Sequence, residues 1–209
     1  MSKKPTEHPE RPFSAIHTIL LFVVVAGIVF VISRFALTRG PRIAGAENPA
    51  VGKAAPNVTF AKLTGEQSIQ LSEQRGKVVL INFWGTWCPP CRAEFPKLVE
   101  VTAPYLARDD FRLISVCVPG GAESQEELAA DAREFLMQQR AEFPALHDPN
   151  SAAFNSLMKS VGAQRGGIPF TVIIDQQGKF AGIWMGYNSG DEEEVAQVLN
   201  MALQTKPKL

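Results

Sequence analysis

The sequence predicts a mixed α/β domain in which helices cover a central sheet, preceded by one membrane-spanning helix. Three observations carry this prediction. Short apolar runs alternate with helical patterns between residues 57 and 204, a hairpin signal lies near the end of the chain, and a long uncharged apolar run lies near its beginning. Strand, helix and strand, followed by a hairpin and a last helix, is the element order of a mixed sheet covered by helices.

The uncharged run extends from Phe13 to Ser33 and contains no Asp, Glu, Lys or Arg. A helix of that length spans about 30 Å, the thickness of the hydrocarbon core of a bilayer. It lacks the polar stripe of a soluble helix, which predicts a membrane helix. Arg34, Arg39 and Arg42 separate the run from the small residues Ala44 to Ala46. The run is also longer than a signal-peptide core, so an uncleaved anchor is favoured over the alternative, a cleaved signal peptide.

The charge pattern leaves the orientation of this helix open and excludes one class of partner. Basic residues flank the run on both sides, so the positive-inside rule predicts neither orientation of the helix. The formal net charge is zero and no basic cluster is visible, which argues against a nucleic-acid partner. Residues 34–50, rich in Gly, Pro and Ala, are predicted to be a linker. Residues 51–209 are then one domain, expected to be a monomer.

The first half of this domain is predicted to contain three strands and a helix. Two β-patterned segments, 57–63 and 68–71, flank a turn and suggest a hairpin. The continuous apolar run at 77–84 is typical of a strand buried on both faces. A helix is predicted over 89–107, since proline is tolerated in the first turn, and Pro96 should kink it.

The second half continues with a further apolar strand at 111–118. A long helix follows at 124–141, where Ser124 and Glu127 have the spacing of a capping box. The later elements are a helix over 152–161, strands over 169–175 and 179–187 joined by a turn at Gly178, and a helix over 191–204 with acidic residues in its first turn.

Two cysteines, Cys88 and Cys91, lie where the buried strand meets the helix. Free backbone N–H groups and the positive end of the helix dipole stabilise a thiolate at that position. The spacing places the second thiol within disulfide reach and one turn further inward. We therefore predict an exposed nucleophile, Cys88, and a more protected resolving thiol, Cys91. Pro89 and Pro90 remove two backbone donors and stiffen the loop between them.

The remaining candidates have less support. A zinc site would need ligands beyond Cys117, His8, His17 and His147, and a disulfide that closes so short a loop would stabilise little. Cys117 is expected to be a buried small hydrophobe in a strand. His147 is expected to be a loop residue without a role, unless the domain binds a metal.

The segment NFWGTWCPPCRAEFPKL, residues 82–98, resembles the thioredoxin superfamily, and specifically its membrane-anchored TlpA/ResA/CcmG-like branch. The motif W-C-x-x-C followed by an acidic residue and a proline is a specific signature. Residues 166–179, GGIPFTVIIDQQGK, are similar to the cis-proline segment of that family, and residues 52–77 to its N-terminal hairpin extension. The resemblance covers about Val51 to Leu203.

The resemblance implies a thioredoxin-like central sheet with an N-terminal β-hairpin extension, and roles for individual residues. Cys88 would be the nucleophile, Cys91 the resolving thiol, and Glu94 a buried acid that exchanges a proton with Cys91. The alternative for Glu94 is a solvated position on the helix face. Trp84 is expected in the core. The residues that would contact substrate are Trp87, which would shield the disulfide, Pro89, Pro90, Ile168 and Pro169, the last following a cis peptide bond.

The implied function is a membrane-tethered thiol-disulfide oxidoreductase that reduces protein disulfides outside the cytosol without a cofactor or metal. Its substrate would be a protein such as apocytochrome c or a copper-site protein, with electrons from a membrane thiol transporter. The chain would cross the bacterial inner membrane once, through Phe13 to Ser33, with residues 1–12 in the cytoplasm and the domain in the periplasm.

Two other functions stay open at this point. A thioredoxin-fold copper chaperone is the first, because soft thiolates suit Cu(I). Relatives that insert copper use C-x-x-x-C, however, and this chain has C-x-x-C. A peroxidase of the peroxiredoxin type is the second, but its cysteine lies in a P-x-x-x-T-x-x-C context, and here Thr86 precedes Cys88 by only two residues.

Overall fold

The computed structural model describes residues 15–37, 45–64, 67–121, 124–163 and 166–205. It divides the chain into two units, Met1–Arg42 and Ile43–Leu209, which are described separately.

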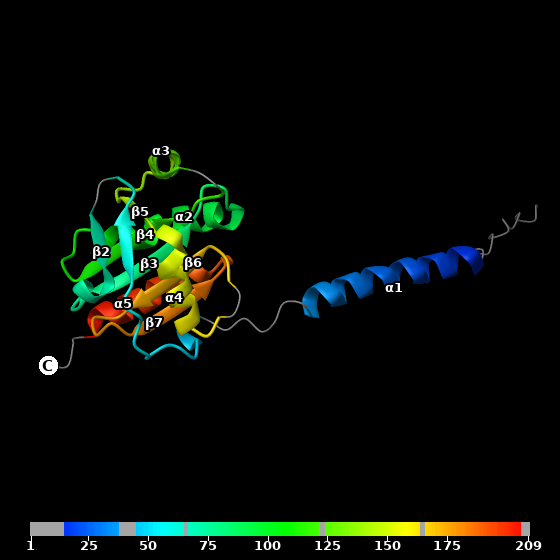
Figure 1. Ribbon diagram of the computed structural model, residues 1–209. Helices are drawn as coiled ribbons and strands as arrows, with labels where there is room; N and C mark the ends of the chain where they lie inside the picture. Colours follow the sequence, from blue (N-terminus) through cyan, green and yellow to red (C-terminus); the bar gives the residue numbers. More distant parts are fainter. Residues whose placement is uncertain (1–14, 38–44, 65–66, 122–123, 164–165, 206–209) are drawn as a thin grey trace, which may run out of the picture. The chain divides into compact units, whose positions relative to one another are not determined.

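The first unit contains the helix α1, Ala15–Leu37 (Figure 1). The side chains described on it are those of residues 19–30, and the large apolar ones among them are exposed. Within the described part of the chain, no helix meets both the length and the apolarity needed to cross a membrane. The predicted span, 13–33, extends past these side chains, and residues 13 and 14 lie outside the described residues. The membrane crossing therefore stays a prediction.

The second unit is built on a mixed sheet, as predicted. Among the described residues the sheet has seven strands in the order β2-β1-β5-β4-β3-β6-β7. The central strand β3 pairs in parallel with β4 and antiparallel with β6 (Figure 1). The strands are β1 (Thr59–Lys62), β2 (Ser68–Gln70), β3 (Val78–Trp84), β4 (Phe111–Cys117), β5 (Ala145–His147), β6 (Phe170–Ile174) and β7 (Phe180–Met185).

The two faces of the sheet have separate cores, because successive side chains of a strand point to opposite faces. On one face, Leu80 packs with α5 (Asp191–Gln204) and α2 (Pro89–Thr102). On the same face, Trp84 packs with α2 and with α3 (Gln125–Gln138). On the other face, Ile81 and Phe83 pack with α4 (Ala152–Ser160). Every residue of β3 is buried, as its continuous apolar run predicted.

The helices agree with the predicted segments, except that α2 and α3 end earlier than predicted, α3 at Gln138. The α2 helix ends at Thr102 and a 3₁₀ turn, Ala103–Tyr105, follows it. Pro104 has no N–H group to continue the helical hydrogen bonds, which explains the early end. Pro96 lies inside α2. The capping box of α3 is confirmed, since Ser124 Oγ accepts from Glu127 N at 3.2 Å and Glu127 Oε2 accepts from Ser124 N at 2.8 Å.

Replacement of Ser124 by alanine is expected to lower the free energy of unfolding by about 1 kcal/mol, because one N–H group of α3 loses its acceptor. Ser124→Asp keeps an acceptor at the same position and is the matched control. Urea denaturation of the three proteins measures the effect. Equal stability of the alanine and aspartate variants would contradict the assigned cap.

Two features differ from the sequence prediction. First, Ala145–His147 form the strand β5, where a loop was expected. Three residues carry too weak a pattern to be recognised, and β5 is stabilised by pairing with β4 and β1. Second, the domain begins before Val51. The backbone N–H groups of Gly45 and Ala46 donate to the Glu194 carboxylate on α5, at 3.2 Å each, so the end of the predicted linker is docked on the domain.

Candidate active site

The cysteine pair lies at the junction of β3 and α2. β3 ends at Trp84, α2 begins at Pro89, and Cys88 is the N-cap residue of the helix. Cys88 and Cys91 form a disulfide with their Cα atoms 5.3 Å apart. Cys88 Sγ also accepts from the backbone N–H of Cys91 at 3.3 Å. Because the prolines at the first two helical positions have no N–H, this is the first donor that the helix offers the sulfur. The same donor is in place to stabilise a Cys88 thiolate.

The expected exposure of Cys88 is wrong for this disulfide state. The residue is 2% exposed and Cys91 is 1% exposed, so both sulfurs are covered. The cover includes the segment that precedes β6, since the carbonyl oxygen of Ile168 lies 3.6 Å from Cys88 Sγ. The sequence around Cys88 does not show that a segment eighty positions later in the chain covers its sulfur. An incoming substrate must therefore displace or replace part of this cover.

The Ile168–Pro169 peptide bond is cis, which confirms the isomer that the resemblance implied. Pro169 lies directly before β6, and its carbonyl oxygen accepts from Gly186 N at 2.8 Å. This bond connects the turn at the start of β6 to the end of β7. The cis-proline turn lies beside the disulfide, where the carbonyl oxygen of Ile168 contacts Cys88 Sγ. The roles of Ile168, Pro169, Pro89 and Pro90 in substrate binding stay predictions.

Glu94 is buried rather than solvated, being only 8% exposed. It lies one turn after Cys91 on α2, and both side chains are on the buried face of that helix. Its Oε2 accepts from Asn82 Nδ2 at 3.0 Å, and its Oε1 accepts from Thr171 Oγ1 at 2.9 Å. Asn82 Nδ2 also donates to Thr171 Oγ1 at 2.9 Å. Residues of β3 and β6 thus hold the carboxyl group that α2 carries.

The environment of Glu94 favours its protonated form. Burial raises the pKa of this carboxyl from 4.5 to about 7, and the hydrogen bonds from Thr171 and Asn82 oppose the rise only in part. A carboxyl group that titrates near neutral pH can both accept and return a proton under physiological conditions. One turn away, the Cys91 thiol has to lose a proton before it can attack a disulfide.

Asn82 and Thr171 are site residues that the sequence reasoning missed. Each is a polar side chain inside an otherwise apolar strand, LINFW for Asn82 and FTVII for Thr171, and each is at most 1% exposed. A buried polar residue needs a hydrogen-bond partner, so such an interruption was a usable signal. The two strands are neighbours in the sheet, with Asn82 opposite Thr171.

The two tryptophans near the disulfide have different environments. Trp84 is fully buried, donates to Ser115 Oγ at 2.8 Å and packs against Phe95 and Phe135, which confirms its predicted place in the core. Trp87 precedes Cys88 and is 51% exposed, with its Nε1 donating to the Val118 carbonyl at 3.0 Å. An exposed indole held by one hydrogen bond is suited to contact a partner protein.

Two candidates lie apart from this chemistry. His147 ends β5 and is half-buried, and burial lowers its pKa more than the neighbouring Asp148 raises it. Cys117 ends β4, is buried as predicted and takes no part in the disulfide. Across the described residues, no group of three or more His, Cys, Asp or Glu side chains is arranged to hold a metal ion.

The comparison with known proteins agrees with this geometry. A family model described as Redoxin matches residues 50–199, most of the chain. The chain belongs to the Redoxin family. The thiol-disulfide oxidoreductase ResA of Bacillus cereus is 29% identical to this Redoxin-family protein over 161 residues, which are 77% of this chain and 82% of ResA.

Two solved structures extend the likeness to three dimensions. One is a Chlorobium tepidum protein provisionally named thiol:disulfide interchange protein DsbE, with 31% identity and a TM-score of 0.57 over 73% of this chain and 97% of that chain. The other is a secreted thiol-disulfide isomerase from Corynebacterium glutamicum, with 26% identity and a TM-score of 0.55 over 70% of this chain and 85% of that chain. With the Cys88–Cys91 disulfide, these relatives identify an enzyme, a thiol-disulfide oxidoreductase of the ResA/DsbE type that acts on protein disulfides.

Proposed function

We propose that this enzyme reduces protein disulfides outside the cytosol while tethered to the membrane by its N-terminal helix. The observation that carries the exchange chemistry is the buried Glu94, one turn from Cys91. An acid that takes the proton of the resolving thiol speeds the step that frees a reduced substrate.

The geometry supports a two-step exchange. The reduced Cys88, as a thiolate at the N-terminus of α2, attacks a substrate disulfide, forms a mixed disulfide and releases the first substrate thiolate. Glu94 then accepts the proton of Cys91. The Cys91 thiolate attacks Cys88 Sγ, the Cys88–Cys91 disulfide forms, and the second substrate thiolate leaves. Two electrons pass to the substrate, and its thiolates take up two protons from solvent.

The tether is supported by the apolar surface of α1. Residues 19–30 expose large apolar side chains, and this surface is larger than a soluble monomer normally leaves in contact with water. A location outside the cytosol is supported by the secreted relative. We infer a single pass through the bacterial inner membrane with the domain in the periplasm.

We further propose the class of partners. The substrate is a protein with two closely spaced cysteines near the membrane, such as the haem-binding segment of an apocytochrome c or a copper-site dithiol. Each turnover leaves the Cys88–Cys91 pair oxidised, so a reductant is required. A membrane protein that transports thiol reducing equivalents from the cytosol fills this role, because the tether keeps the domain next to it.

The test is the reduction potential of the full-length protein in detergent, measured by equilibration in thiol redox buffers. A value near or below about −250 mV, close to that of thioredoxin, supports a reductase. A value above about −150 mV contradicts it and would mean that the protein forms disulfides. Protease treatment of spheroplasts tests the location, since a periplasmic domain is digested and a cytoplasmic one is protected.

A further inference from the structure

We propose that Tyr187 and Glu192 form a latch that closes the solvent entrance to the Glu94 carboxyl group and so controls its proton exchange. The proposal rests on the role of Glu94 in the proposed function. It makes Tyr187 and Glu192 positioning residues, since they act through Glu94 and do not touch the substrate.

The need for an entrance follows from the burial of Glu94. In each turnover the carboxylate takes one proton from Cys91 and becomes a neutral acid. The proton leaves Glu94 either to the Cys91 thiolate, when the disulfide is next reduced, or to water. For a carboxyl group that is only 8% exposed, the second route needs an entrance. A small pocket of about 10 Å³ adjoins Glu94 on the side of α5, and Tyr187 and Glu192 also line it.

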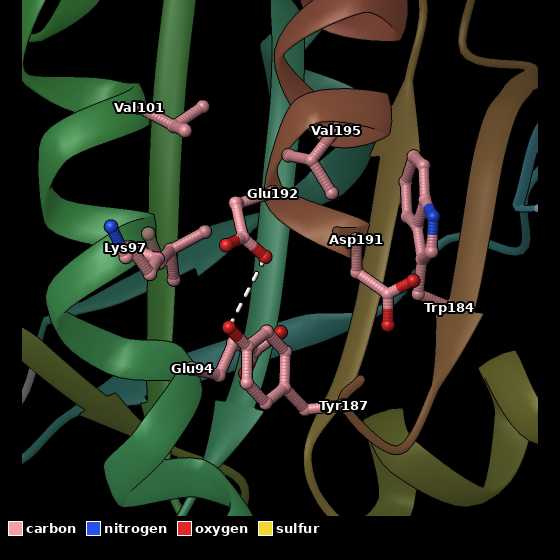
Figure 2. Close-up of a pocket in the computed structure, with 9 residues that line it drawn as sticks. Glu94, Lys97, Val101, Trp184, Tyr187, Asp191, Glu192 and Val195 are labelled. Atoms are coloured by element: carbon pink, nitrogen blue, oxygen red, sulfur yellow. Dashed lines mark hydrogen bonds between the residues drawn. The ribbon is translucent and has the colours of Figure 1, made fainter. Parts of the chain in front are cut away.

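The latch is a hydrogen bond at this pocket. The Tyr187 hydroxyl donates to Glu192 Oε2 at 3.1 Å, and in Figure 2 the ring of Tyr187 lies in front of the Glu94 carboxyl group. Both Tyr187 and Glu192 are partly exposed, whereas Glu94 is buried, and all three side chains line the same pocket. Burial is the largest cause of the raised pKa of Tyr187, and the charge of Glu94 is a smaller one, which agrees with their proximity.

The loop that carries Tyr187 is held mainly through the first turn of α5. Glu192 Oε2 accepts from Gly190 N at 3.1 Å as well as from Tyr187, and Asp191 Oδ2 accepts from Asn188 N at 2.8 Å. Gly186 and Gly190 have φ of 77° and 102°, in the left-handed region that favours glycine. A loop bounded by two such glycines can turn Tyr187 outward without moving β7 or α5.

The charged groups that line the pocket act on Glu94 in opposite directions, so they do not by themselves give the sign of the expected effect. Lys97 on α2 favours the carboxylate, whereas Asp191 and Glu192 on α5 disfavour it, and all three line the pocket. The groups facing Glu94 from β3 and β6 are the neutral Asn82 and Thr171. Burial is the largest cause of the raised pKa of Glu94. Opening the latch admits water and must lower that pKa.

The test is an NMR titration of the Glu94 carboxyl carbon in the full-length disulfide form in detergent, with glutamate labelled by carbon-13 and Glu94→Gln used for assignment. Tyr187→Phe removes the latch but keeps the ring, and we expect a lower titration midpoint. Tyr187→Ala also removes the ring, and we expect a fall of at least about one pH unit. Tyr105→Phe removes a hydroxyl that donates to Asn200 outside the pocket, and is the matched control without a shift.

The Tyr187→Phe variant distinguishes the latch from a purely electrostatic effect on the pKa of Glu94. In Tyr187→Phe the Glu192 charge remains and loses its donor, so electrostatics alone would raise the Glu94 midpoint. A lowered midpoint supports the latch; an unchanged or raised midpoint in Tyr187→Phe, or an unchanged midpoint in Tyr187→Ala, overturns it. The titration uses the resting disulfide without substrate. Its result is therefore independent of the reduction potential, which tests the proposed function.

Discussion

Replacement of Cys88 by serine is expected to abolish disulfide exchange, whereas replacement of Cys91 is expected to trap mixed disulfides with substrates. Cys88 is the N-cap of α2 and receives the Cys91 N–H, the environment that stabilises a reactive thiolate. A serine hydroxyl at this position does not form a disulfide. In Cys91→Ser the first exchange still takes place, but no thiol remains to release the substrate.

The measurement is insulin reduction driven by dithiothreitol, together with non-reducing electrophoresis of cells that express each variant. Cys88→Ser should fall to the uncatalysed rate, and Cys91→Ser should accumulate adducts that disappear on reduction. Cys117→Ala is the control, because Cys117 lies outside the disulfide. Activity of Cys88→Ser at the level of the unmodified protein would refute the assignment of the nucleophile.

Replacement of Glu94 by glutamine is expected to change both the stability and its dependence on pH. The folded state binds the Glu94 proton more tightly than the unfolded chain, because burial raises the pKa from 4.5 to about 7. The free energy of unfolding therefore falls as pH rises from about 4.5 to about 7, by about 3 kcal/mol when the shift is fully expressed. The Glu94→Gln variant has no such ionisation. Its free energy of unfolding should therefore equal that of the unmodified protein at pH 4.5 and be higher at pH 8.

The same substitution should slow release of the substrate, because glutamine does not accept the Cys91 proton. Proton transfer by a positioned side chain contributes about 10² or more to a rate, so we expect a loss of about 10²-fold in the resolution step near pH 7. Urea denaturation between pH 4.5 and 8 and single-turnover reduction measure the two effects. Glu100→Gln changes an exposed acid on the same helix and is the control. A flat pH dependence for the unmodified protein would contradict the buried acid.

The position of the site could be predicted from sequence because it depends on short-range features. The buried strand β3 is apolar except for Asn82, α2 begins with two prolines, and Cys88 and Cys91 flank these prolines. The capping box at Ser124 is equally local. Each of these features is contained in fewer than twenty consecutive residues.

The environment of the site could not be predicted in this way. Glu94 reads equally well as a solvated or a buried helix residue, and only the approach of Asn82 and Thr171 decides between them. Cys88 is covered by Ile168, eighty positions along the chain. The strand β5 contains three residues and depends on its neighbours for its hydrogen bonds.

The order of the elements apart from β5, the family and the two sulfurs that exchange electrons thus follow from the amino-acid sequence. Periodicity, caps and a cysteine spacing act over one or two turns of helix or one strand, and remain visible in a linear chain. The tertiary structure alone decided that Glu94 is buried and titrates near neutral pH, and that Tyr187 meets Glu192 at its entrance. Burial and long-range hydrogen bonds depend on which elements pack together, and those contacts determine the proton affinity of a carboxyl group.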